Sequence, residues 1–251
     1  MKFSLRFSAL LICLFGGLIG VSDDVPIAPL LPIEHTTWGK VYILEAEQLE
    51  VVVSPEEGAV VSLKHRIAGD FIYSPLRIEP TPKVTTEASL TGNWENRAWR
   101  TSEGRQVVML SRSVGPPLSL RIVHLIEVNA TGTTFSQRTR ITGTGPGDHS
   151  LLGPSFEVGL SPSPDTSLVN DAYSLRYGDI GTTWQSTWSI ESPERPIESS
   201  LNVDETRKGN LLSGHPTSEL ALPPQGWTLL CTVNMTWSNL PADRSPEASS
   251  L

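Results

Sequence analysis

Cysteine is nearly absent from this sequence of 251 residues. Only Cys13 and Cys231 occur, and Cys13 lies inside an apolar N-terminal run. If that run is removed during export, Cys231 is left alone. An intramolecular disulfide and a cysteine-based zinc site are then both excluded. We expect Cys231 to be a small buried residue on a strand at 227–237.

Positive charge is also scarce. The chain has 19 Lys and Arg residues against 27 Asp and Glu residues, a net charge of −8. Without residues 1–22 the balance is 17 against 27, or −10. Binding to phosphate backbones requires clustered Lys and Arg, so we expect no nucleic-acid partner. The acidic balance favours solubility and identifies no partner by itself.

The longest apolar run lies at the N-terminus. Lys2 and Arg6 precede the apolar run 7–19, and small residues follow at 20–22. This order is typical of a secretory signal peptide, so we predict cleavage after residue 22 and export to the periplasm or the extracellular space. A retained anchor is the alternative, but the run is short for the roughly 30 Å of hydrocarbon in a bilayer. No later segment is apolar enough to span a membrane.

Helical periodicity is missing after residue 40, where no apolar stripe repeats at i, i+3, i+4 and i+7. Short runs of β-branched and apolar residues separated by turn residues predict strands instead. In the clearest run, 118–128, alternate residues from Leu118 to Val128 form an apolar face. The predicted strands are 41–45, 49–53, 59–65, 71–73, 97–101, 105–112, 118–128, 133–143, 155–160, 182–190 and 226–237.

This pattern predicts one antiparallel, all-β sandwich domain over residues 40–237. An extended lead-in at 23–39 precedes the domain, and a flexible tail at 238–251 follows it. From 161 to 224 the apolar runs are short, and Pro, Ser, Asp and Gly are frequent. We expect long loops there, with disorder at 192–210.

Two strand-like runs in 49–65 are joined by a turn in which Pro55 fixes φ and Gly58 can adopt a positive φ. This hairpin resembles the opening of the galactose-mutarotase-like superfamily. The resemblance extends from about Tyr42 to Trp237, and it is closest to the smaller members without an assigned activity. It is carried by the hairpin, by the segment 93–100, by the strand pair 118–143 and by the run 226–230. It implies an antiparallel β-supersandwich that faces carbohydrate.

The resemblance also implies where an epimerase would carry its acid and its base. Such members use a histidine in a His-Pro-aromatic context and a glutamate late in the chain. Here the only His-Pro is His215-Pro216, which Thr217 follows, and the only glutamate after the last predicted strand is Glu247. Both departures argue against epimerase activity. Signatures of serine hydrolases, zinc proteases and phosphate-binding loops are missing as well.

Tryptophan, asparagine and arginine gather between residues 94 and 100. A sugar offers C–H faces that stack on indole rings, and hydroxyls that bind planar donors and acceptors. We therefore predict that Trp94, Asn96, Arg97, Trp99 and Arg100 bind the ligand. The alternative, in which both tryptophans are core anchors with solvated arginines between them, stays open.

The histidines support this prediction only at one position. His149 follows strand 133–143 in a loop rich in Gly and Pro, so it is a further candidate ligand residue, with simple solvent exposure as the alternative. His124 lies on the apolar face of its strand, where we expect a core histidine satisfied by one hydrogen bond. His65 ends a strand between two basic residues, so we expect it to point to water. Trp184 and Trp188, four residues apart, are a second stacking candidate or core residues.

These observations predict an exported carbohydrate-binding protein that uses the concave face of a sheet and lacks epimerase activity. Two alternatives remain open: a sugar-active enzyme, either epimerase-like or polysaccharide-processing, and a structural envelope protein without a small ligand. No metal and no cofactor is predicted.

Overall fold

The structure is a computed structural model that describes residues 26–82, 94–116, 119–145, 151–163, 165–169, 172–190, 196–218, 220, 222 and 226–240. The predicted signal peptide at 1–22, the tail beyond 240, His149 and Glu247 lie outside these ranges. Within the described residues, no helix is long and apolar enough to cross a membrane.

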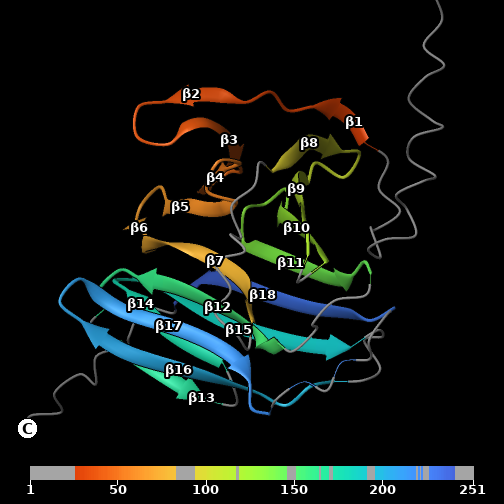
Figure 1. Cartoon of the computed structure of the whole chain (residues 1–251). Helices are drawn as coiled ribbons and strands as arrows, with labels where there is room; N and C mark the ends of the chain where they lie inside the picture. The colour runs from red at the N-terminus through yellow and green to blue at the C-terminus, as the bar shows by residue number, and fades with distance from the viewer. Residues whose placement is uncertain are drawn as a thin grey trace, which may run out of the picture.

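All the described strands belong to two antiparallel sheets (Figure 1). The first sheet has, among the described residues, nine strands. In spatial order they are β1 (Pro26–Pro29), β8 (Glu95–Thr101), β9 (Gln106–Val114), β10 (Leu120–Val128), β11 (Thr134–Gly143), β18 (Thr228–Asn239), β15 (Ile180–Ile190), β14 (Ala172–Tyr177) and β13 (Asp165–Val169).

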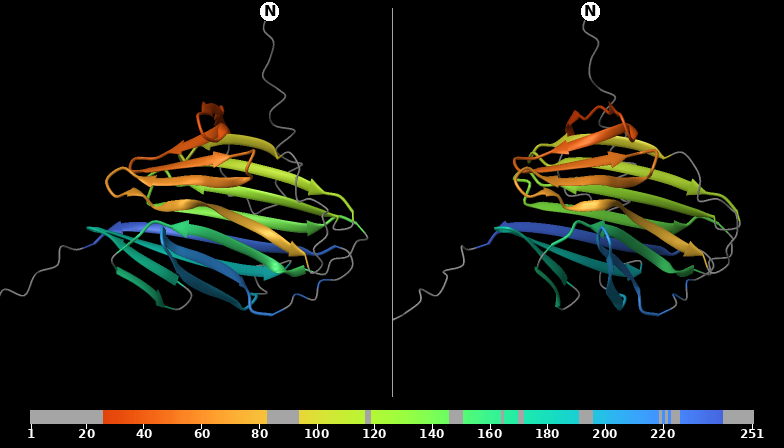
Figure 2. Two further views of the ribbon diagram at one scale, coloured as in Figure 1. Left: turned by 60° about the vertical axis from the view of Figure 1, so that its left-hand side comes forward. Right: turned by 90° about the vertical axis from the view of Figure 1, so that its left-hand side faces the viewer.

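The second sheet runs in the order β16 (Ser199–Thr206), β17 (Gly209–Pro216), β12 (Leu151–Leu160), β7 (Ile72–Pro82), β5 (Ala59–His65), β4 (Leu49–Ser54), β3 (Gly39–Glu45) and β2 (Ile33–His35), and β6 (Gly69–Asp70) pairs with β5. The two sheets stack on each other, as the turned views show (Figure 2). The prediction of an all-β antiparallel sandwich is therefore confirmed.

Alternation along β10 shows why these segments form a sandwich. Leu120, Ile122, Ile126 and Val128 are buried on the inner face, which looks toward the second sheet. Side chains of the second sheet, such as Leu76 and Phe156, share the main core with Ile126 and Val128. Burial of each such side chain contributes about 1.5–3 kcal/mol, so the sum over the core sets the fold.

The inner face of the first sheet is covered by two different partners. The main core cluster contains residues of both sheets, such as Val108 and Phe156. A smaller cluster lies at the end of the sheet around Ile122 and Leu229, where Leu220 and Trp227 provide the cover. Trp94 packs against both clusters, so it marks the boundary between them.

The hairpin between β4 and β5 follows the sequence prediction. The turn lies at 55–58, and Gly58 has φ of +63°. A Cβ atom at this position would lie 2.1 Å from Nε1 of Trp94, so the indole ring rests against the turn. Only glycine fits both demands, the positive φ and the close approach.

The expectation of long loops in 161–224 is wrong. Strands β13, β14, β16 and β17 lie in this region, and β16 and β17 occupy part of the segment 192–210 for which disorder was expected. Only Leu201 of β16 is buried, and β13 is exposed along its whole length. β13 and β16 pair through their backbones at the sides of the sheets, so their sequences carry little alternation.

The expectation for His65 is also wrong. His65 has no exposed surface, and its ring lies 4.5 Å from the Trp237 ring and 5.7 Å from the Phe71 ring. Its Nδ1 accepts hydrogen bonds from the backbone N–H groups of Ile67 and Ala68, at 3.2 and 3.1 Å. The turn after β5 folds back over the ring, so the imidazole becomes part of the core.

Candidate functional site

Strand β8 carries most of the predicted ligand residues and divides them between two faces. Asn96 lies opposite Leu110 of β9 in the register, and Arg100 lies opposite Gln106. Both therefore share the inner face, where Trp94 also packs. Arg97 and Trp99 have the opposite parity and lie on the outer face. The five residues do not line one groove.

Asn96 is held by the fold itself. The hydroxyl of Tyr42 in β3 donates a hydrogen bond of 2.7 Å to Oδ1 of Asn96. Nδ2 of Asn96 donates to the carbonyl oxygen of Trp94 at 3.1 Å. Burial raises the pKa of Tyr42, so its hydroxyl stays protonated and remains a donor. Asn96 thus connects the edge of the first sheet to β3 and fixes the backbone at Trp94.

A polar and aromatic cluster lies next to this connection. We call Trp94, Arg112, His124 and Thr139 the Trp94 cluster. The Trp94 and His124 rings are 4.7 Å apart with an angle of 35°, and the guanidinium carbon of Arg112 lies 4.4 Å from the centre of the Trp94 ring. Arginine above an indole ring gains a cation–π attraction of about 0.5–2 kcal/mol. The cluster orients one half-buried cation at the end of the main core.

His124 is the buried base of this cluster. Its Nδ1 shares a hydrogen bond of 2.8 Å with Oγ1 of Thr139, and only 1% of the residue is exposed. Burial lowers the pKa of His124 to about 3, with a further contribution from the charge of Arg112. The ring is therefore neutral at physiological pH. The prediction of a core histidine satisfied by one hydrogen bond is confirmed.

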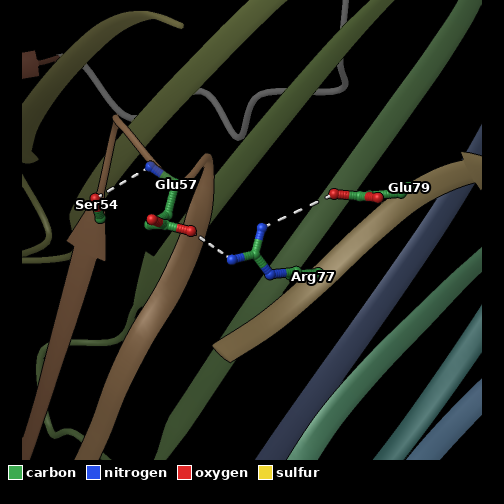
Figure 3. A network of polar contacts seen from close by, with 4 residues as sticks. All are labelled: Ser54, Glu57, Arg77 and Glu79. Atoms are coloured by element: carbon green, nitrogen blue, oxygen red, sulfur yellow. Dashed lines mark hydrogen bonds and ion pairs between the residues drawn. The ribbon is translucent and has the colours of Figure 1, made fainter. Parts of the chain in front are cut away.

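Strand β7 and the turn between β4 and β5 carry a network of charged side chains (Figure 3). Nη2 of Arg77 forms an ion pair with Glu57, and Nη1 lies 4.0 Å from Oε1 of Glu79. Ser54 Oγ accepts a hydrogen bond of 3.2 Å from the backbone N–H of Glu57. Burial lowers the pKa of Arg112, whereas the charge of Glu79 raises it. The electrostatic environment of the Trp94 cluster therefore includes both sheets.

Sequence reasoning missed Arg112 and Glu79. Arg112 occupies an inward position of β9, in phase with Val108, Leu110 and Val114. A charged residue in the apolar phase of a strand is the signal that could have identified it, because burying a guanidinium requires partners. The other stacking candidates, Trp184 and Trp188, are buried at 1% and 3% exposure, so they belong to the core.

A separate hollow of about 470 Å³ lies along the ends of β13, β14, β15 and β18. Ser174 and Thr183 join hydroxyl groups there at 3.2 Å. The lining residues are mostly polar: Asp165, Thr166, Ser167, Ser174, Leu175, Arg176, Gly181, Thr182, Thr183, Thr236, Trp237, Ser238 and Leu240. None of the described residues predicted to bind ligand lines this hollow. In the described ranges, no three His, Cys, Asp or Glu side chains are arranged to hold a metal ion.

No model of a known protein family and no curated protein sequence matches the chain. Solved structures do share its fold. A candidate mutarotase from Salmonella typhimurium superimposes with a TM-score of 0.52 at 9% identity, over 84% of this chain and 97% of that one. A heparinase III gene product gives 0.54 at 8% identity, over 85% of this chain and 37% of that one.

A TPR-domain containing protein from Parabacteroides distasonis gives a TM-score of 0.52 at 11% identity, over 91% of this chain and 57% of that one. The chain thus spans little more than half of this protein and about a third of the heparinase III structure. At these identities the comparisons concern the fold alone. They confirm the galactose-mutarotase-like fold that the resemblance of the sequence predicted.

Proposed function

We propose that this chain, with its galactose-mutarotase-like fold, is an exported carbohydrate-binding protein without epimerase activity. The observation that carries the proposal is the Trp94 cluster, in which a half-buried indole and a guanidinium lie together at the boundary of the two core clusters. Sugars bind to such pairs because they offer apolar ring faces beside hydroxyl groups. Two solved structures of the same fold bear names of sugar-related proteins, a candidate mutarotase and a heparinase III, which supports the class of ligand.

The state of His124 argues against epimerisation. An epimerase needs a histidine that donates a proton to the ring oxygen and a carboxylate that removes the anomeric proton. With a pKa of about 3, His124 carries no proton to donate as an imidazolium near pH 7. Its described hydrogen bond goes to Thr139 and not to a carboxylate. The cluster is therefore suited to binding and not to proton transfer.

A glycan array with the protein lacking residues 1–22 tests the proposal, with variants that separate the two faces of the first sheet. Arg112→Met and Trp94→Ala should each weaken binding by about tenfold or more, because both contribute to the inner face. Trp99→Ala is the matched control, since Trp99 lies in β8 of the same sheet and faces outward. If only Trp99→Ala abolishes binding, the ligand binds to the outer face of the sheet, and the proposed site on the inner face is wrong. If Trp94→Ala does not fold, Arg112→Met still tests the same site.

Polarimetry of freshly dissolved glucose and galactose completes this test. The expected rotation decay equals that in buffer alone, since His124 is neutral and sealed. A faster decay, lost in His124→Gln, would identify an epimerase instead.

A structural envelope protein without a small ligand is the second candidate. Its support is the packing of Trp94, whose ring touches Gly58 on the turn and His124 and Arg112 on the first sheet. These contacts occupy an indole that a sugar would otherwise stack on. Binding to no glycan on the array would favour this candidate.

A further inference from the structure

The outer face of the first sheet carries arginines in its centre. Along β10, Arg121 and Glu127 have the parity opposite to that of the buried residues Ile122 and Ile126. Across β11, Arg138 and Arg140 share this outer face, because Arg138 pairs with Leu125 and Arg140 with Val123. We call Arg121, Arg138 and Arg140 the arginine face. It stands out in a chain with a net charge of −8.

One acidic residue of this face is already engaged. Nη2 of Arg138 lies 2.7 Å from Oε1 of Glu127, and both side chains are largely covered. Arg121 and Arg140 remain. They are diagonal neighbours, since Arg140 lies opposite Val123, two residues beyond Arg121 on the same face. Diagonal Cα atoms of this kind are about 7–8 Å apart, within reach of long side chains.

The residues that flank this arginine pair are neutral. Arg121 lies between Ser113 and Thr142 in the registers, and Arg140 lies between Val123 and Leu230. In the part of the chain that the structure describes, no carboxylate forms an ion pair with Arg121 or Arg140. The pair therefore repels itself, without an opposite charge from the neighbouring strands.

Arg140 shows the cost of this arrangement. Its Nε and Nη1 atoms are buried and have no hydrogen-bond acceptor among the described residues. Burial lowers the pKa of Arg140, and the charge of Arg121 lowers it further. Buried donors without acceptors are destabilising, and two like charges on one face add to that cost. An anion at this place would offset both.

We infer that the arginine face binds an acidic polysaccharide, with a carboxylate or sulfate group held by Arg121 and Arg140. Guanidinium groups bind such anions through paired, charge-assisted hydrogen bonds. Hydroxyls suited to the rest of a sugar ring lie alongside, because Thr142 and Thr228 are neighbours at 3.4 Å on the same face. The inference rests on the proposed carbohydrate function but names a second surface, on the opposite side of the sheet from the Trp94 cluster.

The class of anion follows from the number of arginine side chains available on this face, which is two. Nucleic-acid backbones carry closely spaced phosphates and are bound by many Lys and Arg residues at once. A single arginine pair bordered by hydroxyls fits one carboxylate or sulfate on a sugar better than a run of phosphates. The overall negative charge of the chain further disfavours a nucleic acid.

Affinity electrophoresis of the purified protein tests the inference, with polygalacturonate and dextran sulfate as probes and neutral dextran as the reference. Arg121→Gln combined with Arg140→Gln should weaken binding to at least one acidic probe by about tenfold or more. The matched control is Arg207→Gln combined with Lys208→Gln, which removes two exposed charges in the turn between β16 and β17. It should leave binding unchanged. Arg140→Lys keeps the charge but loses the planar fork, so it should retain only part of the affinity.

Any of three results would overturn the inference. One is equal loss of binding in the arginine pair and in the control pair, which would indicate attraction by total charge alone. Another is absence of binding to both acidic probes, and the third is equal binding to a single-stranded DNA oligonucleotide. Because Arg112→Met and Trp94→Ala alter the other face, their effect on neutral glycans reports on the proposed function separately.

Discussion

At the scale of single residues, odd or even spacing along a strand decides which face of the sheet a residue occupies, even for residues that lie close together in the sequence. Trp94 and Trp99 are five residues apart, an odd number, and the structure places them on opposite faces of the first sheet, Trp94 just before β8 and Trp99 within it. The sequence contained this information, because side chains alternate along any strand. What it could not reveal is the neighbour of each face: the contact of Trp94 with Gly58 joins residues of different sheets. The burial of His124 was predictable, because it follows from the alternation of its own strand. The surroundings of Trp94 were not, because they depend on a contact with the turn of the second sheet.

His124 makes the stability of the fold depend on pH. Its pKa falls from 6.5 to about 3 on folding, so below pH 6.5 the unfolded state binds more protons than the folded state. The contribution of His124 to the free energy of unfolding is fully present above about pH 7. It declines as the pH drops through 6.5 toward 3, by at most about 1.4 kcal/mol per pH unit. Urea unfolding at pH 7.5, 6 and 5 should show a smaller decline for His124→Gln than for the unmodified protein.

His215→Gln is the control for this measurement. His215 is exposed on β17, so its replacement removes a histidine from the surface and leaves the core intact. An identical decline in His124→Gln and the unmodified protein would mean that the folded state does not lower the pKa of His124.

At the scale of elements, strands that bury a face were predictable and strands at the sides of the sheets were not. The ranges 49–53, 59–65, 118–128 and 133–143 agree closely with β4, β5, β10 and β11. β13 and β16 bury almost nothing, so neither has the alternation that marks a strand. Their structure comes from backbone pairing with β14 and β17, which local sequence does not encode.

The turn between β4 and β5 gives the sharpest test at this scale. Gly58→Ala adds a Cβ atom at positive φ and 2.1 Å from the Trp94 indole, so it should destabilise the fold by about 2 kcal/mol or more. Gly178→Ala is a matched control, because Gly178 has φ of +61° and nothing lies within 4 Å of its added Cβ. It should cost only the conformational strain, about 1 kcal/mol.

Chemical denaturation and near-UV circular dichroism check this prediction. The tryptophan signal should change in Gly58→Ala and remain in Gly178→Ala. Equal destabilisation by the two variants would show that Trp94 does not rest on the turn.

At the scale of the whole molecule, the two sheets share one main core, so they should unfold together. Cys231 is a probe for this, because it lies in the core on β18 with 1% exposure and burial raises its pKa. In a chain that begins at Asp23 it is the only thiol. Its reaction with a thiol reagent should follow the rate of global unfolding. Faster labelling, while the circular dichroism stays native, would show that the sheets separate before the molecule unfolds.

The position of β13 has a consequence for how molecules of this protein meet. In the described part of the chain, β13 pairs only with β14, and its Leu168 and Val169 are exposed at 47% and 61%. The first sheet therefore ends in an edge strand whose outer backbone N–H and C=O groups can pair with a strand of a second polypeptide. At neutral pH, repulsion between the negatively charged molecules keeps two such edge strands apart. This repulsion weakens as the pH falls toward the isoelectric point near 5.2.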